Sequence, residues 1–72
     1  MRRDRIISKL RELGYSFKQD AWRVQIFRNS VTLHSIQVRK RDDIDDDWVR
    51  SVLRQAGCSK EEIEEFIGRN NN

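Results

Sequence analysis

The sequence predicts a single α+β domain in which one helix precedes a three-stranded antiparallel sheet and two helices follow it. Three observations predict this class. An apolar stripe with helical spacing opens the chain, three short strand-like runs occupy its middle, and two further helical stripes close it. A chain of 72 residues has room for one core. We expect the first two helices to pack over one face of the sheet and to leave the other face open.

The segment 4–15, DRIISKLRELGY, has the pattern of an amphipathic helix. Asp4 lies near its start, where the helix dipole favours an anion. Gly14 is suited to the left-handed conformation that ends a helix. The apolar side chains that form one stripe are Ile6, Ile7, Leu10 and Leu13.

Three extended runs follow, and short polar segments separate them. Asp20 and Ala21 fit a first tight turn, and Asn29 and Ser30 fit a second, because Asn tolerates a positive φ. The second run places Trp22, Val24 and Ile26 on one face and Phe27 on the other, unless a β-bulge reverses part of that alternation. Which of these faces meets the helices stays open. The runs are residues 15–19, 22–28 and 31–38.

Two helices close the chain. Residues 45–57 begin with three aspartates, which supply a cap and first-turn negative charge, and end at Gly57. Cys58 then takes the position where an apolar group packs back on the last turn. The short third helix starts at Ser59, which has capping-box spacing to Glu62, and ends at Gly68. We expect residues 1–68 to form the domain and residues 69–72 to fray.

The composition excludes several classes of site. One cysteine rules out an internal disulfide. Because the chain also has only one histidine, we expect no structural metal site and no cofactor. The longest apolar runs are two or three residues, so no membrane span is expected. Arg2 and Arg3 are not followed by the apolar stretch of a signal peptide. These features favour a cytoplasmic protein.

Charge is distributed unevenly along the chain. Residues 1–41 carry eleven Lys or Arg against three Asp or Glu, whereas residues 42–72 carry four against nine. A basic half suits a polyanion such as RNA, although it also suits a merely solvated surface. The strands can bring the basic side chains onto one surface that contacts phosphate. These are Lys18, Arg23, Arg28, Arg39, Lys40 and Arg41.

Two other features are candidates for chemistry. The acidic run 42–47 lacks the glycine and the ligand spacing of an EF-hand loop, so we assign it to helix capping and solvated charge. Whether this run contacts the basic surface stays open. His34 is the only side chain whose ordinary pKa lies near neutrality, and it is therefore the only candidate for imidazole acid–base catalysis. A single histidine on a strand is more often structural.

Residues 44–59 combine Ile44, a polar spacer and the helical segment VRSVLRQAGCS. With this segment the chain resembles the HicA family of toxin–antitoxin ribonucleases, and the resemblance extends over nearly its whole length. The resemblance is strongest in residues 44–59, where an Ile, a polar spacer and a helix of the type L-R-S-I-L-R-Q-A-G-L-S recur in the family. The opening MRRDRIISKLRELGYSF and the IFR of residues 26–28 also match. The matching residues of the strongest segment are Ile44, Val49, Arg50, Ser51, Val52, Leu53, Arg54, Gln55, Ala56, Gly57 and Ser59.

This resemblance implies a fold like that of the double-stranded RNA-binding domain, cleavage of mRNA, and neutralisation by a HicB-type antitoxin protein. The family's catalytic histidine lies in a Gly-Ser/Asn-His motif directly before this strand's Ile-Phe/Tyr pair. Without gaps, Trp22, Arg23 and Val24 occupy the three motif positions. Valine cannot accept or donate a proton, so the family's mechanism cannot run through residue 24. Trp22 and Arg23 are suited instead to stacking and phosphate contact.

Three hypotheses follow. The favoured one is a HicA-like RNA-binding protein without the histidine-dependent endonuclease mechanism. The second is an active mRNA interferase with a displaced catalyst such as His34. The third is a protein-interaction module that uses the exposed sheet face, including Trp22. A plainer role for Trp22 is to cover the core at the edge of the sheet.

Overall fold

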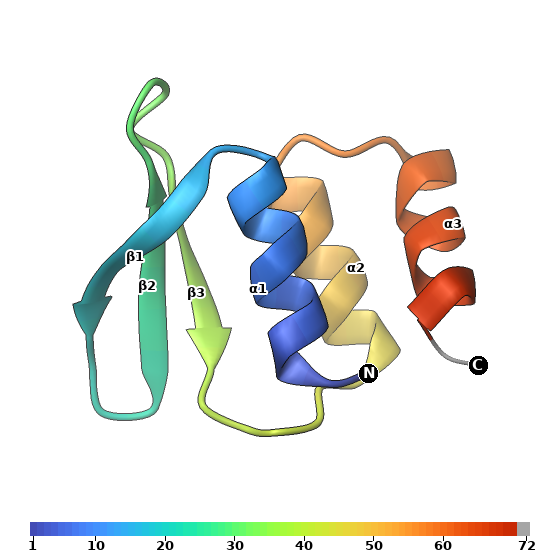
Figure 1. The fold of residues 1–72 in the computed structure, drawn as a ribbon, viewed down its shortest axis with the longest axis horizontal. Coiled ribbons are helices and arrows are strands. Elements are labelled where there is room, and N and C mark those ends of the chain that lie inside the picture. Colours follow the sequence, from blue (N-terminus) through green and yellow to red (C-terminus); the bar gives the residue numbers. More distant parts are fainter. Residues whose placement is uncertain (71–72) are drawn as a thin grey trace.

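The fold was analysed in a computed structural model, which describes residues 1–70. A helix, three antiparallel strands and two further helices follow one another, so the predicted α+β class and the α-β-β-β-α order are confirmed (Figure 1). The elements are α1 (Arg3–Glu12), β1 (Tyr15–Asp20), β2 (Val24–Asn29), β3 (Ser35–Arg39), α2 (Asp46–Gln55) and α3 (Lys60–Asn70).

The sheet has the order β1-β2-β3, and both pairs are antiparallel. Phe27 of β2 is opposite Phe17 of β1 and Ile36 of β3. The register shifts between Phe17 and Gln19, so the bulge lies in β1 and not in the second strand, where the sequence left room for one. The alternation along β2 is therefore uninterrupted.

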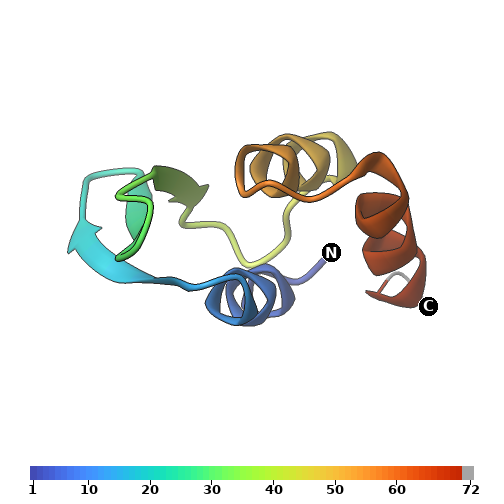
Figure 2. The same ribbon diagram turned by 90° about the horizontal axis from the view of Figure 1, so that it is seen from above.

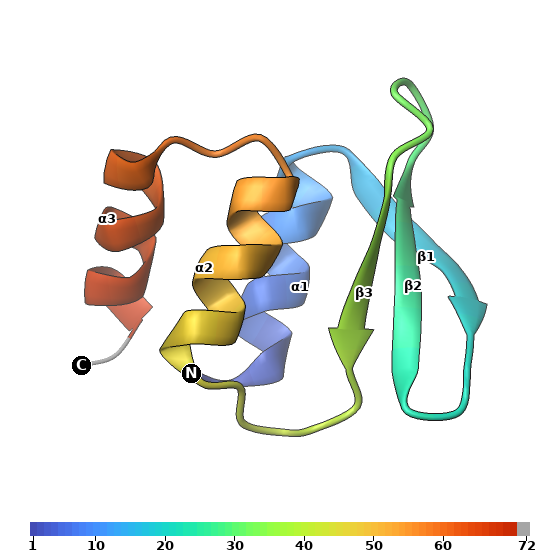
Figure 3. The same ribbon diagram turned by 180° about the vertical axis from the view of Figure 1, so that it is seen from behind.

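The helices cover one face of the sheet. α1 contacts β1 and α2 contacts β3, while α3 packs against α2 on the side away from the sheet (Figure 2; Figure 3 shows β3 from behind). Phe27, Ile36 and Val38 point into this core, with exposures of 2% or less. Val24 and Ile26 alternate with Phe27, so they lie on the open face, and both are partly exposed. This settles which face of the sheet carries Val24.

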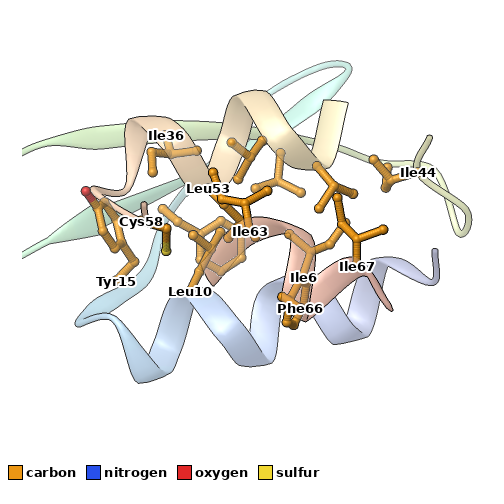
Figure 4. Packing of buried hydrophobic residues seen from close by; sticks show 14 residues of the cluster. Ile6, Leu10, Tyr15, Ile36, Ile44, Leu53, Cys58, Ile63, Phe66 and Ile67 are labelled. Carbon is orange, nitrogen blue, oxygen red and sulfur yellow. The ribbon is translucent and has the colours of Figure 1, made fainter. Parts of the chain in front are cut away.

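One hydrophobic cluster fills the space between the sheet and the three helices (Figure 4). Cys58 is part of it, and burial raises the pKa of its thiol above the ordinary value, which agrees with the packing role expected from the sequence. The buried members are Ile6, Leu10, Tyr15, Phe27, Ile36, Val38, Ile44, Val49, Val52, Leu53, Cys58, Ile63, Phe66 and Ile67.

Two predicted strand boundaries were wrong. Trp22 and Arg23 lie in the turn before β2, because the backbone N–H of Ala21 donates to the Val24 carbonyl at 3.0 Å and closes the turn there. Residues 31–34 form a loop before β3 despite their β-branched members. The Asn29 side chain causes this, since its Oδ1 accepts the backbone N–H groups of residues 31 and 32 at 2.9 and 3.1 Å.

The predicted helix caps are present. Asp45 Oδ1 accepts the Trp48 N–H at 2.8 Å, and the side chains of Ser59 and Glu62 bond each other's backbone N–H groups at 3.2 and 3.0 Å. Gly57 has a φ of +94°, and the next residue, Cys58, donates to the Leu53 carbonyl at 3.0 Å. This is the expected Schellman ending.

The third helix is longer than predicted. It continues through Gly68 as far as Asn70, the last residue that the structure describes, so the expected end at Gly68 is wrong. An isolated glycine inside a helix costs only about 1 kcal/mol. The buried Phe66 and Ile67 anchor this turn and offset that cost. The last residues of the predicted tail, 71–72, lie outside the described part of the chain.

The first residues of the chain pair with the segment between β3 and α2. The Arg3 N–H donates to the Asp42 carbonyl at 2.8 Å, and the Ile44 N–H donates to the Met1 carbonyl at 2.7 Å. These bonds connect the start of α1 to the exit of β3 and bring the buried Ile44 into the core.

Candidate nucleic-acid interface

The antiparallel sheet places the start of β2 beside the end of β3, and six of the predicted site residues meet there. Val24 is opposite Arg39, and the Lys40 N–H donates to the Arg23 carbonyl at 3.2 Å. Both segments lie at the lower end of the sheet in Figure 1. We call the open hollow that they form the cationic end. It is lined by Trp22, Arg23, Val24, Arg39, Lys40 and Arg41.

Trp22 stands out from the cationic end into solvent. It is 83% exposed, so it does not cover the core at the sheet edge, and that plainer role is wrong. The Arg23 guanidinium carbon lies 4.4 Å from the centre of the Trp22 ring, in the geometry of a cation–π pair. The turn thus presents an aromatic ring and a positive charge as one unit.

Arg39 is held by two groups that the sequence did not single out. Its guanidinium lies 4.9 Å from the centre of the Trp48 ring at the start of α2. Its carbonyl accepts Nε of Arg3 at 2.8 Å, and the same guanidinium of Arg3 also donates to the Gln25 side chain. Arg3 and Trp48 therefore support the cationic end from the helix side. These contacts join segments that are far apart in the sequence, so no local sequence pattern predicts them.

One carboxylate partly balances the charge of the cationic end. Asp20 Oδ1 lies 2.8 Å from Nζ of Lys40 and also accepts the Gln25 side-chain amide at 3.3 Å. These two hydrogen bonds, the one from Lys40 first, hold the pKa of Asp20 below its ordinary value. Within residues 1–70, the side chains of Arg23 and Arg41 make no ion pair, so their charges are free for a ligand.

The other two predicted phosphate contacts do not lie at the cationic end. Lys18 and Arg28 line a separate hollow together with Ser16, Ser30 and Leu33. Because Arg28 is near the far end of β2, four residues beyond Val24, the predicted basic surface divides into two clusters.

His34 lies directly before β3, in the loop at the end of the sheet opposite the cationic end. Its carbonyl accepts the Asn29 N–H at 2.9 Å, and its exposed ring meets the Tyr15 ring edge-on at a centroid distance of 6.2 Å. Val24 and Asn29 are the two ends of β2. At a rise of about 3.3 Å per residue, some 17 Å of strand separates them. His34 therefore cannot act on a group bound beside Val24.

The acidic run, residues 42–47, leads from the segment after β3 into the start of α2. Asp45 caps the helix, and Asp47 lies 3.2 Å from the Arg50 guanidinium, so these two carboxylates serve α2. Among the residues that the structure describes, no group of three or more His, Cys, Asp or Glu side chains is placed to hold a metal ion. Asp45 therefore has the capping role that the sequence predicted for this run.

No family model, curated protein or solved structure matches this chain. In residues 1–70, no helix has the length and apolar character needed to cross a membrane.

Proposed function

We propose that this chain is a HicA-like RNA-binding protein of a toxin–antitoxin-type system that works in the cytoplasm without the family's histidine mechanism. The resemblance in residues 44–59 and the α-β-β-β-α order support the family assignment. RNA, with mRNA as the natural form, and a HicB-like antitoxin are the proposed partners. A HicB-like reading frame next to the gene would support this pairing.

One observation carries the RNA-binding part of the proposal. Two separate segments of the chain bring an exposed tryptophan and four basic side chains to one hollow. Basic groups bind phosphate without regard to sequence, and an exposed aromatic ring can stack on a base. Val24, at the position of the family's catalytic histidine, adds an apolar contact and no proton transfer.

A charge-removal series tests this proposal. In the triple variant Arg23→Gln, Arg39→Gln, Arg41→Gln, we expect RNA affinity at about 50 mM salt to fall strongly and the slope of log K against log salt to shrink by about 2, since single strands give about 0.7 per phosphate contact. Binding is measured by fluorescence anisotropy, and circular dichroism shows that the variant is folded.

The matched control removes the same charge from α2 and α3. Arg54, Lys60 and Arg69 are exposed and lie on the helices away from the cationic end, so their change to Gln should leave the slope nearly unaltered. Equal losses in both triples would show that binding is not located at the cationic end. If the unchanged protein has no affinity for RNA, the hypothesis of a protein-interaction module that uses the exposed sheet face is favoured instead.

The displaced-nuclease alternative has its own test. It requires RNA to be bound near His34, at the end of the sheet that also carries Lys18 and Arg28. We expect purified protein to leave mRNA intact. Cleavage that disappears in His34→Ala, with binding retained, would overturn the proposal that the protein only binds RNA.

A further inference from the structure

We propose that the turn of Trp22 and Arg23 is a base-stacking platform, and that the cationic end therefore selects unpaired, single-stranded RNA over duplex RNA. This inference rests on the proposed RNA binding and adds the class of RNA. The observation behind it is a large aromatic ring that the fold leaves in solvent. Trp22, the largest apolar side chain at the sheet end, is 83% exposed and contributes nothing to the core cluster.

The ring of Trp22 has one occupied face and one free face. Arg23 lies over the ring at 4.4 Å, and a single guanidinium can cover only one side of a planar indole. An exposure of 83% leaves the other side in solvent. A nucleobase placed there would complete a stack of guanidinium, indole and base. Every base has a π-face, so this contact selects for accessibility and tolerates different sequences.

The backbone of this turn is held in place without a ligand. On one flank, the Ala21 N–H closes the turn onto the Val24 carbonyl at 3.0 Å. On the other flank, the Lys40 N–H bonds the Arg23 carbonyl at 3.2 Å, and the Lys40 ammonium pairs with Asp20 at 2.8 Å. A turn whose backbone is held on both flanks loses little backbone entropy on binding.

The basic residues at the end of β3 lie in the same hollow as the platform. Residues 39–41 line the same hollow as Trp22, so a strand whose base stacks on the ring has its backbone next to these basic groups. A base inside a duplex is stacked on its neighbours and cannot offer a face to the indole, whereas an unpaired base can. The arrangement thus favours an unpaired strand.

The second tryptophan near the site shows the contrast. Trp48 is only partly exposed, packs against the core cluster, and has Arg39 over its ring at 4.9 Å. Its role is to hold Arg39 in position. Trp22 is therefore the one ring at the cationic end with a face open to a base.

The test compares one short pyrimidine-rich RNA as a single strand and as a duplex, using the full chain. We expect tighter binding of the single strand. Trp22→Ala should weaken single-strand binding by about 5- to 150-fold, the range of one lost base–aromatic stack, and should leave duplex binding nearly unchanged. Trp22→Phe, which keeps a smaller ring, should retain most of the affinity.

Two further readouts separate stacking from charge. The salt slope should stay the same in Trp22→Ala, because no phosphate contact is lost. In a Trp48→Phe background, Trp22 is the only tryptophan, and its fluorescence should be quenched by the single strand. Because Trp22 is exposed, its replacement leaves the fold intact, and circular dichroism checks this.

The outcomes distinguish this inference from the proposed function. If the protein binds neither form of RNA, both fail. If it binds both forms equally and Trp22→Ala changes nothing, RNA binding stands and the stacking platform is wrong. Equal weakening of single-strand and duplex binding by Trp22→Ala would also overturn the selection for unpaired RNA.

Discussion

The two hairpin turns at opposite ends of the sheet differ in what they present to solvent. The turn between β1 and β2, residues 21–23, carries an exposed ring stacked on a cation. The loop between β2 and β3, residues 30–34, carries Val31 and Leu33 with exposures of 88% and 61%. Local hydrogen bonds hold both turns: the Ala21 N–H donates to the Val24 carbonyl in the first, and the Val31 N–H donates to the Asn29 side chain in the second.

This difference shows how strand order gathers charge. In an antiparallel meander the last strand ends beside the first turn, so the basic residues 39–41 reach the Trp22 turn and not the second loop. The second loop lies beside the start of β1, where Asn29 bonds the Leu13 carbonyl at 3.2 Å. One end therefore gathers positive charge, and the other is anchored to α1.

The largest effect is expected in the middle of the sheet, on which both ends depend. Phe27→Ala should destabilise the domain by about 3–5 kcal/mol, because a fully buried ring is replaced by a cavity. Phe17→Ala removes the same ring from the neighbouring position of β1, where it is 51% exposed, and should cost much less. Urea denaturation measures both. Equal losses would contradict the burial of Phe27 against the helices.

The next largest effect is expected at Asn29, which holds the loop between β2 and β3 at the end of the sheet opposite the cationic end. Asn29→Ala removes two acceptor contacts and one donor contact, and should destabilise the domain by about 2 kcal/mol. Asn29→Asp keeps the acceptors and should cost less. Amide hydrogen exchange should show faster exchange at Val31 and Thr32 in Asn29→Ala alone. Unchanged exchange there would mean that another group holds the loop.

A smaller effect of opposite sign is expected at Leu33. Its φ of +65° lies in the left-handed region, which costs a non-glycine residue about 1–2 kcal/mol. Leu33→Gly should therefore raise the free energy of unfolding by about 1 kcal/mol. A calorimetric scan checks this, with Val31→Gly as the control that should not stabilise. Destabilisation in Leu33→Gly would show that the leucine makes contacts that outweigh the strain.

The smallest effect is expected at Asp20, whose carboxylate pairs with Lys40 and offsets part of the positive charge of the cationic end. Asp20→Asn should raise RNA affinity by about two- to fivefold, as expected for one exposed ion pair. Because the folded-state pKa of Asp20 is lowered, its contribution to stability is present above the unfolded value of about 3.9 and is lost as the pH falls through the folded value. The variant should therefore lose less stability on acidification. Identical acid profiles would contradict this.

Much of the fold could be predicted because its signals are local. The capping box of Ser59 and Glu62, the cap at Asp45 and the left-handed Gly14 and Gly57 depend on neighbours within a few residues, and all are present. One error arose where a nearby side chain overrode propensity. β-branched residues predicted a strand from residue 31, but Asn29 captured their N–H groups and made a loop.

The candidate site was predictable in composition and not in arrangement. The basic residues and Trp22 are visible in the sequence, yet their division between two hollows follows from sheet register. The supports supplied by Arg3 and Trp48 come from segments that only packing brings near Arg39. The separation of His34 from Val24 likewise appears only when the ends of β2 are known.

The pairing of residues 1–3 with residues 42–44 makes the first part of the chain a closed ring. Its backbone bonds join segments that α1 and all three strands separate in the sequence. Closing so long a loop is slow and entropically costly, so we expect this ring to form after the hairpins during folding. These bonds also tether the start of α1 to Asp42, the residue that follows Arg41. Fraying at the start of the chain would break these bonds, and we expect it to loosen the segment next to Arg41 at the cationic end.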